Sequence, residues 1–235
     1  MKAIVLCGGK GTRLRPYTYS IPKPMLPLGN RPILEFVINN LKRHGFKEVY
    51  LTLGYLKEQI MDYFGDGSKF GVKIKYFTEE KEMNTAGSTL PCKSYIDDTF
   101  IVVMGDHLTA INTQKFVDFH KKKGAFATLA LKKTGVPLEY GVAHIDGESN
   151  ILRFEEKPIV QNLVNSGLYC FEPEVFDYIK VGYDFARDVF PALMKNKKKM
   201  CGYVFDEYWI DIGRVPDYEH LNQTISIVDL VTHEK

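Results

Sequence analysis

The chain opens with a short apolar run that leads straight into a cluster of glycines. Residues 3–7 are all apolar, and Gly8, Gly9 and Gly11 follow within four positions. A fully apolar run of this length is typical of a strand buried on both faces, as in a parallel sheet. The feature therefore favours an α/β fold whose first strand delivers a glycine-rich loop.

Strand-like and helix-like segments alternate through the first half of the chain. Strand-like runs occupy residues 48–53, 73–77 and 100–104, and helical patterns occupy residues 31–44, 58–64 and 85–95. Alternation of this kind predicts a mostly parallel sheet with helices on both of its faces.

The pattern changes after residue 125. Strand-like runs at 126–131, 141–145, 151–154 and 164–171 precede helical segments at 173–179, 184–195 and 216–231. Because no low-complexity linker divides the chain, we expect one domain spanning residues 1–235, with a mixed, mostly parallel sheet shared by both halves.

Composition limits the partners that the chain can have. Its 31 basic and 29 acidic side chains give a formal charge of +2, which argues for neither nucleic acid nor an anionic membrane. The apolar runs are far shorter than the ~20 residues of a membrane span, and glycines interrupt the first run too early for a signal peptide. We therefore expect a cytoplasmic protein.

The glycine-rich loop is accompanied by two cations. Arg13 lies two residues after Gly11, and Lys23 stands between two prolines. Glycines expose backbone N–H groups to an approaching anion, and two positioned cations suit a polyphosphate. The loop lacks the Gly-Lys-Ser/Thr ending of a Walker A motif, and Leu14 replaces the third glycine of a dinucleotide fingerprint. A plain strand-to-helix turn is the alternative interpretation.

Several short motifs occur along most of the chain. They are G-G-x-G-T-R-L with P-K-P (residues 8–24), T-A-G (85–87), G-D (105–106), E-Y-G (139–141), F-E-E-K-P (154–158), N-S-G-L-Y (165–169) and W-I-D-I-G (209–213). Taken in this order, they resemble the motifs of the sugar-1-phosphate nucleotidyltransferase family. The resemblance implies a Rossmann-like three-layer α/β/α sandwich. It also implies transfer of a nucleotidyl group from an NTP to a sugar 1-phosphate, with release of pyrophosphate.

The resemblance assigns roles to residues of the first half, which is expected to bind mainly the nucleotide (residues 1–125). It implies catalytic roles for Arg13 on the departing pyrophosphate, Lys23 on the α-phosphate, and Asp106. The implied nucleotide-binding residues are Leu6, Gly8, Gly9, Gly11, Thr12, Arg13, Thr85 and Gly87. Asp106 and Asp211 follow or lie within apolar strands, and the resemblance makes them ligands of Mg²⁺, an ion that prefers carboxylate oxygens. A helix N-cap for Asp106 and a salt bridge for Asp211 are the alternatives.

The second half, residues 126–235, is expected to bind mainly the sugar phosphate. The implied residues are Tyr140, Gly141, Glu156, Lys157, Asn165 and Arg187, with simple packing as the alternative for Tyr140. Glu156 would accept bonds from sugar hydroxyls and Lys157 would pair with the sugar's phosphate. Because Pro158 follows, we expect a break in the strand at Lys157 that lets both neighbours reach one site.

The choice of substrates is less constrained. Residues 165–176 and 188–191 look closest to the mannose-1-phosphate guanylyltransferase branch, while glucose-1-phosphate thymidylyl-, uridylyl- and cytidylyltransferases share the framework. A non-catalytic nucleotide-sugar-binding subunit is the alternative from another class. Asn84 replaces a glycine of the common family pattern, and we expect it to keep a positive φ.

The end of the sequence raises two further expectations. The short stretch after Gly213 predicts that the C-terminal β-helix domain of some relatives is absent. Apolar residues near the C-terminus are expected either to pack on the core or to form an interface in a homo-oligomer, and the sequence pattern is compatible with both. They are Ile225, Ile227, Val228 and Leu230.

Overall fold

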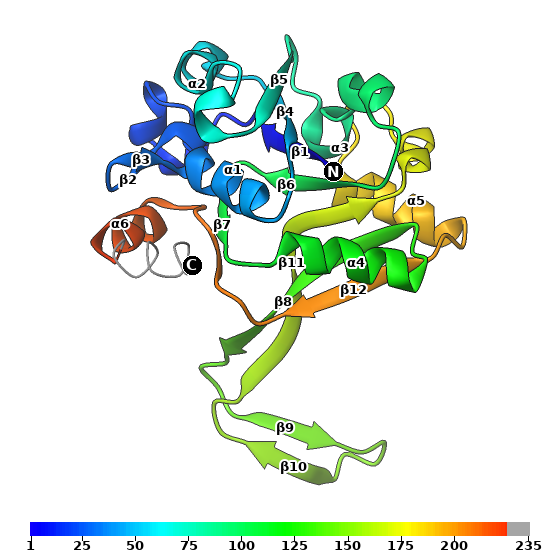
Figure 1. The fold of residues 1–235 in the computed structure, drawn as a ribbon. Helices are drawn as coiled ribbons and strands as arrows, with labels where there is room; N and C mark the ends of the chain where they lie inside the picture. Colours follow the sequence, from blue (N-terminus) through cyan, green and yellow to red (C-terminus); the bar gives the residue numbers. More distant parts are fainter. Residues whose placement is uncertain (225–235) are drawn as a thin grey trace.

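A seven-stranded sheet forms the centre of the protein in the computed structural model, which describes residues 1–224 (Figure 1). In order across the sheet, the strands are β12 (Met200–Phe205), β8 (Ala127–Pro137), β11 (Ile159–Phe171), β6 (Phe100–Met104), β1 (Lys2–Cys7), β4 (Glu48–Leu53) and β5 (Lys73–Thr78). β11 runs antiparallel to both neighbours, and the other six strands run parallel to one another. The predicted mixed, mostly parallel sheet is confirmed.

Helices cover both faces of this sheet. They are α1 (Ile33–Arg43), α2 (Lys57–Phe64), α3 (Asn84–Gly87), α4 (Thr113–Lys123) and α5 (Phe190–Lys195). The last helix, α6 (Val215–Gln223), packs in a separate apolar cluster. Side chains of α1, α2 and α4 belong to one buried cluster, and side chains of α3 and α5 belong to a second cluster on the opposite face. The result is the expected Rossmann-like three-layer sandwich.

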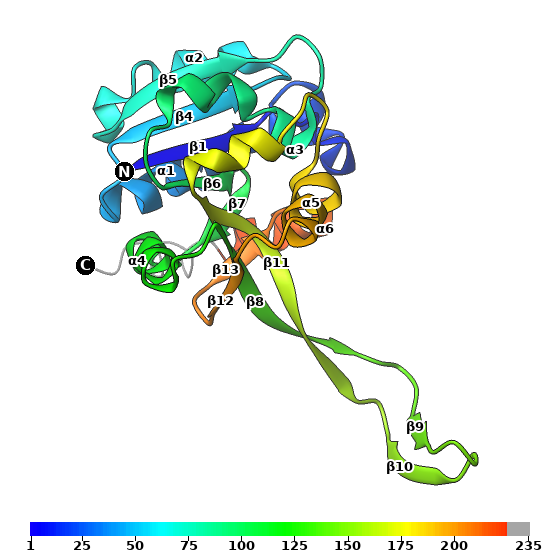
Figure 2. The ribbon, with the colours of Figure 1, turned by 90° about the vertical axis from the view of Figure 1, so that its right-hand side faces the viewer.

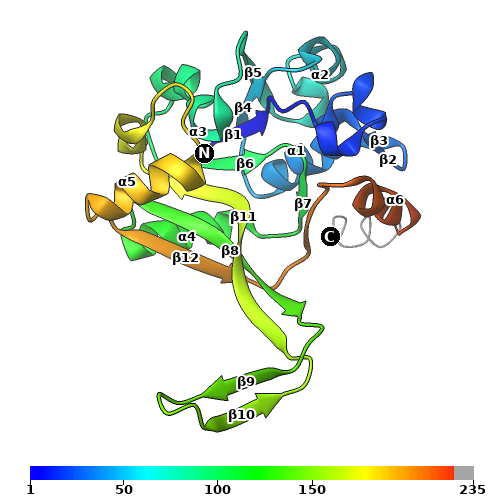
Figure 3. The same ribbon diagram turned by 180° about the vertical axis from the view of Figure 1, so that it is seen from behind.

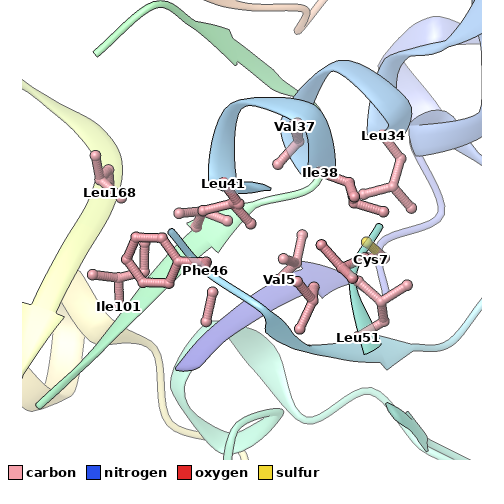
Figure 4. Close-up of a cluster of buried hydrophobic side chains, with 14 of the residues drawn as sticks. Val5, Cys7, Leu34, Val37, Ile38, Leu41, Phe46, Leu51, Ile101 and Leu168 are labelled. Carbon is pink, nitrogen blue, oxygen red and sulfur yellow. The ribbon is translucent and has the colours of Figure 1, made fainter. Parts of the chain in front are cut away.

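Figure 4 shows the first cluster between α1 and the central strands. Leu34, Ile38 and Leu41 of α1 are at most 1% exposed, and they share this cluster with Val5 of β1 and Leu51 of β4. Spacings of three and four residues place these side chains on one helix face. Burying each of them stabilises the fold by about 1.5–3 kcal/mol. This packing fixes β1 and therefore the start of the glycine-rich loop.

Two short strands extend the framework around the end of β6. β7 (His107–Thr109) pairs antiparallel with β13 (Trp209–Asp211), with Asp211 opposite His107. A second small pair, β2 (Pro27–Leu28) with β3 (Arg31–Pro32), precedes α1. A third apolar cluster, which includes Leu14, Leu108 and Ile212, joins these segments to α6.

The two strands not yet described, β9 (Val142–Ile145) and β10 (Ile151–Glu155), belong to a projection from the sheet. β8 and β11 continue beyond the sheet as a two-stranded ribbon, and β9 and β10 form a hairpin at its end. We call residues 133–163 the arm. Figures 2 and 3 show the hairpin standing clear of the helical layers in two further views.

The observed limits of helices and strands agree best with the expected ones in segments where a single hydrophobic pattern dominates. The expected strands 48–53 and 100–104 are observed with the same limits as β4 and β6. The expected helix 85–95 instead divides into α3 and a 3₁₀ turn at Leu90–Tyr95, because Pro91 cannot continue a helix from α3. The expected helix 184–195 begins as a wide turn at Phe185–Val189 before α5.

Two expectations cannot be compared with the structure. Residues 225–231 of the last expected helix lie outside the described residues, and so do the four apolar residues near the C-terminus. Within residues 1–224, no helix combines the length and the apolar character that crossing a membrane requires.

Candidate active site

The loop after β1 is shaped by Gly11. Its φ of +60° lies in the left-handed region, and a Cβ there would be 3.0 Å from Thr18 Cγ2 and 3.1 Å from Lys23 Cβ. The Thr18 hydroxyl donates to the Gly11 carbonyl at 2.8 Å, and the buried Leu14 anchors the other side of the loop. A residue larger than glycine at position 11 would therefore strain the backbone and crowd Lys23.

Arg13 and Lys23 occupy different environments around this loop. Arg13 is exposed, and its guanidinium lies close to Gly213 and Asp211. The Lys23 side chain is only 11% exposed and forms ion pairs with Asp106 and, at 3.5 Å, with Asp211 Oδ1. One cation thus faces solvent at the rim, while the other is held between two carboxylates.

The two carboxylates come from segments that are far apart in the sequence. Asp106 follows β6 at the carboxyl edge of the sheet, and pairing of β13 with β7 carries Asp211 to the same place. Ligand atoms of Asp106, His107 and Asp211 lie within 4.8 Å of one another. This is the position that the sequence predicted for the carboxylate pair, and His107 joins it.

His107 is oriented by its other ring nitrogen. Nδ1 lies 2.8 Å from the carbonyl oxygen of Ser166, to which Trp209 Nε1 also donates. Nε2 lies 3.3 Å from Asp211 Oδ1 and 3.7 Å from Asp106 Oδ1. With an acceptor beside each nitrogen, the imidazole favours the doubly protonated form.

Charges at this cluster shift two pKa values. Burial lowers the pKa of His107, but the close contact with Asp211 and the two carboxylate charges outweigh it, so that the pKa is raised. The pKa of Asp211 is lowered to about 2, chiefly by its contact with His107, and by Lys23 and Arg13 in addition. Asp211 is therefore ionised throughout the physiological range.

The cluster fits a hard divalent cation. Asp211 Oδ1 is buried and accepts no hydrogen bond of good geometry from the described residues, although it is ion-paired. Carboxylate oxygens are the donors that Mg²⁺ prefers, and both aspartates present them toward one point. Asp106 and Asp211 are the residues that could hold this ion.

Two adjoining pockets lie over the end of β1. The first, of about 240 Å³, lies against the loop and is lined by Gly9, Gly11, Thr12, Arg13 and Lys23, among others. The second, of about 230 Å³, is lined by Gly8, Glu79, Asn84 and Thr85, among others. Leu6, Gly9 and Asp106 line both pockets, which therefore form one continuous groove from the loop to the segment after β5.

Most of the predicted nucleotide-binding residues are brought together in this groove, with one difference. Gly87 is buried outside both linings, and its N–H donates to the Tyr183 carbonyl at 3.0 Å. A Cβ at Gly87 would be 2.9 Å from the Gly182 nitrogen, which accounts for a small residue there. The predicted positive φ of Asn84 is confirmed at +55°.

The structure does not bring the predicted sugar-phosphate residues to the groove. Tyr140, Gly141, Glu156 and Lys157 are on the arm, outside both pocket linings, and Tyr140 is 81% exposed. The expected strand break is present, because β10 ends at Glu155 and Lys157 has a φ of +44°. Their role in sugar binding remains a prediction.

The remaining two predicted residues lie on the main body of the protein. Asn165, at the base of the arm, donates to the Tyr169 hydroxyl at 2.9 Å. Arg187 is exposed beside Asp184 and lies outside both pocket linings.

Two residues at or beside the groove received no individual role from the sequence. His107, beside the groove, carried a weak signal, since it directly follows the strand-end Asp106. Glu79 begins the segment 79–87, which the family resemblance places near the base, and it directly follows β5 at a strand's carboxyl end. Its Oε2 accepts from the Met83 N–H at 3.2 Å, whereas its buried Oε1 has no hydrogen-bond partner among the described residues.

Fold and groove together define an α/β protein with the chemistry to bind a polyphosphate and a divalent cation at the carboxyl edge of its sheet. The chain belongs to the nucleotidyl transferase family, whose sequence pattern matches residues 2–226.

Known proteins similar to this chain include two enzymes and one solved structure. UTP–glucose-1-phosphate uridylyltransferase of Synechocystis is 41% identical over 93% of this chain and 61% of its own length. Mannose-1-phosphate guanylyltransferase of Mycobacterium tuberculosis is 38% identical over 92% of this chain and 62% of its own. The chain thus spans about three fifths of the length of both.

The solved structure is a Bacillus anthracis protein assigned as a glucose-1-phosphate thymidylyltransferase. It aligns with all of this chain and 96% of its own, with a TM-score of 0.77 and 24% identity. This likeness confirms the fold.

Proposed function

We propose that the protein transfers a nucleotidyl group from a nucleoside triphosphate to a sugar 1-phosphate, releasing pyrophosphate and an NDP-sugar. The observation that carries this proposal is the groove in which Arg13 and Lys23 flank the strand-end Asp106. The sugar phosphate attacks the α-phosphorus in line, and negative charge develops on the departing pyrophosphate. Arg13 stabilises that leaving group, and Lys23 stabilises the α-phosphate, without a covalent intermediate.

We propose further that Mg²⁺ binds at Asp106 and Asp211, whose oxygens lie within 4.8 Å of each other at the edge of the groove. When bound, the ion supplies Lewis-acid stabilisation of phosphate charge. The two aspartates would hold it at the carboxyl edge. Lys23, which is paired with both of them, lines the groove where phosphate would bind. A cytoplasmic location remains a prediction from composition.

Glu79 supports guanine as the base. Its side chain lines the second pocket, and its buried Oε1 has no hydrogen-bond partner among the described residues. A carboxylate can only accept hydrogen bonds. Guanine presents two adjacent donors, N1–H and the N2 amino group, to such an acceptor. Uracil and thymine present one N–H flanked by two carbonyl oxygens, which the carboxylate repels. The geometry therefore supports GTP, and with the sequence resemblance it supports mannose-1-phosphate guanylyl transfer.

The sugar 1-phosphate is assigned to the second half of the chain, residues 126–235. Glu156 accepts hydrogen bonds from sugar hydroxyls, and Lys157 pairs with the sugar's phosphate. The proximity of Glu156 Oε2 to Gly141, 2.8 Å from the position of a Cβ, supports a shared binding surface for these two residues.

The experiment is a matrix of five nucleoside triphosphates against mannose, glucose and heptose 1-phosphates, read by pyrophosphate release. GTP with mannose 1-phosphate should give the highest kcat/KM. Glu79→Gln should lower kcat/KM for GTP by about 10–100-fold, the value of one charge-assisted hydrogen bond. Glu80→Gln is the matched control, because Glu80 is exposed outside the second pocket. A GTP preference that survives Glu79→Gln would refute the role given to Glu79.

A second candidate is uridylyl transfer to glucose 1-phosphate, favoured by the 41% identical relative. A preference for UTP in the same matrix would select it and leave the reaction class unchanged. Thymidylyl and cytidylyl transfer are tested in the same way. The presence of Arg13, Lys23 and Asp106 in the groove, with Asp211 beside them, argues against a non-catalytic nucleotide-sugar-binding subunit.

A further inference from the structure

The hairpin at the end of the arm has one polar face and one apolar face. On the polar face, His144 Nε2 and Arg153 Nε lie 3.3 Å and 3.0 Å from Glu155 Oε1. On the other face, Ile151 pairs with Ile145 and Phe154 pairs with Ala143. Such alternation is typical of strands that pack one face on a core.

That apolar face is left in water. Ile145, Ile151 and Phe154 are 60%, 68% and 62% exposed, and Leu152 beside them is 69% exposed. Further along the arm, Ile159 is 61% exposed. Soluble monomers rarely expose contiguous apolar patches of this kind, and their presence marks an interaction surface.

The ribbon that carries the hairpin also lacks partners within residues 1–224, because both of its strand edges are unpaired there. Along residues 133–137 and 159–163 the two strands pair with each other and with no third strand of the described residues, so both edges offer free backbone groups. A two-stranded ribbon is at best marginally stable alone in water. The arm therefore needs a surface that covers it.

The chain's own body is not placed to provide that surface. The β8–β11 ladder is unbroken from the Ile159–Pro137 pair to the Asn165–Leu131 pair, and after an irregularity between Asn165 and Tyr169 the two strands pair again in the central sheet. At the base of the arm, Lys132 Nζ donates to the carbonyls of Asp206 and Glu207 at 2.6 Å and 2.8 Å. Bending the ribbon back over its own groove would break these bonds.

The arm also carries Glu156 and Lys157, two predicted sugar-phosphate residues that the groove lacks. In the proposed function, Glu156 and Lys157 bind the acceptor, whereas Arg13, Lys23 and Asp106 bind the donor in the groove. Each chain thus carries both parts of one site and holds them apart. A second copy of the same chain can supply arm residues to the groove of the first copy, and the first copy can supply its arm residues to the groove of the second.

We propose that two copies of this chain form a dimer by exchanging arms, so that Lys157 of each copy completes the groove of the other. This inference rests on the proposed function for the role of Lys157. A two-fold axis makes both contacts identical and closes the assembly, so both apolar hairpin faces are covered at once. The arm's apolar face supplies the binding energy, and Glu156 and Lys157 supply the chemistry.

The first test measures the mass of the full chain by light scattering and sedimentation. The wild type should be a dimer at micromolar concentration, and Ile151→Ser with Phe154→Ser should raise the dimer dissociation constant at least about tenfold. Because both side chains are exposed, the variant should still fold. Val181→Ser is the control, since Val181 is 72% exposed outside the arm. A monomeric wild type, or an equal effect of the control, would overturn the proposal.

The second test mixes two inactive variants. Arg13→Ala and Lys157→Ala, co-expressed and purified together, should form mixed dimers in which one groove has both residues. With half of the dimers mixed and one groove of two complete, activity should recover to about a quarter of wild type. If arms act within their own chain, the mixture will stay as inactive as the single variants, and the exchange is refuted. A wild type without nucleotidyl transfer would refute the proposed function instead, while the mass measurement still judges the dimer.

Discussion

At the scale of single residues, local stereochemistry decides where the charges of the groove lie. Gly11 adopts a left-handed φ that other residues avoid, and this turn places Arg13 at the rim. Lys23 is held between two carboxylates on a short turn bounded by prolines. The loop and this turn thus bring two cations to one groove.

Arg13→Ala should lower kcat by roughly 10²–10⁴-fold, because it removes a preorganised charge from the leaving group. The Tm should hardly change, since the side chain is exposed. Arg15→Ala is the matched control: Arg15 lies two positions on, over the ring of Tyr19, and outside the pocket linings. Steady-state kinetics of both variants check this, and a near-normal kcat for Arg13→Ala would contradict its role.

Gly11→Ala should destabilise the fold by about 1–3 kcal/mol through its positive φ and its contact with Thr18. Gly9→Ala provides the comparison, since a Cβ there meets nothing within 4 Å. Urea unfolding of the two variants measures the difference. Equal stabilities would mean that the loop tolerates a side chain at position 11.

At the scale of elements, the sequence was most informative where a single period dominates a segment. Buried parallel strands such as β4 and β6 are continuous apolar runs, and their limits follow from where polarity begins. The arm was different: β8 and β11 continue through polar residues, for example Lys132 to Thr134, because pairing between two strands needs no apolar pattern. Strand length there is set by the partner strand and was therefore underestimated.

The packing of α4 against β8 predicts a pH dependence of stability. His120 is fully buried, with Nδ1 at 2.8 Å from Thr128 Oγ1 and Nε2 at 3.0 Å from Glu172 Oε1. Burial lowers its pKa despite the nearby carboxylate, so the folded state favours the neutral ring. The unfolded chain takes up the proton near pH 6.5, and stability should fall as the pH decreases below that value.

Urea midpoints of the wild type and His120→Gln between pH 7.5 and 5.5 measure this effect. The loss of stability on acidification should be smaller in the variant, which has no ring to protonate. Parallel pH profiles for the two proteins would show that His120 does not carry the dependence.

At the scale of the whole molecule, the groove at the carboxyl edge of the sheet could be predicted from the sequence, whereas the place of Glu156 and Lys157 could not. Gly8 and Asp106 directly follow β1 and β6, and the ends of parallel strands meet at one edge. Lys23 and Asp211 reach the same place through a 3₁₀ turn and the β7–β13 pair. Glu156 and Lys157 lie on the arm, whose direction depends on the twist and packing of β8 and β11. No short-range pattern encodes that direction.

Removal of divalent metal should abolish transfer, and added Mg²⁺ should restore it. Asp106→Asn and Asp211→Asn should each lower kcat and raise the Mg²⁺ concentration needed for half-maximal rate, because each loses a charged oxygen ligand. Asp217→Asn, in the first turn of α6, is a control outside the cluster. An aspartate variant with the wild-type Mg²⁺ dependence would exclude that residue as a ligand.

Nucleotidyl transfer is tested best by following the α-phosphate itself. GTP labelled at the α-phosphorus is incubated with the protein, Mg²⁺ and mannose 1-phosphate, and pyrophosphate and labelled products are counted together. Nucleotidyl transfer predicts one labelled GDP-sugar for each pyrophosphate released, and neither product when the sugar phosphate is omitted. Release of inorganic phosphate with labelled GDP, or no sugar-dependent product with any nucleotide and sugar 1-phosphate pair, would contradict it.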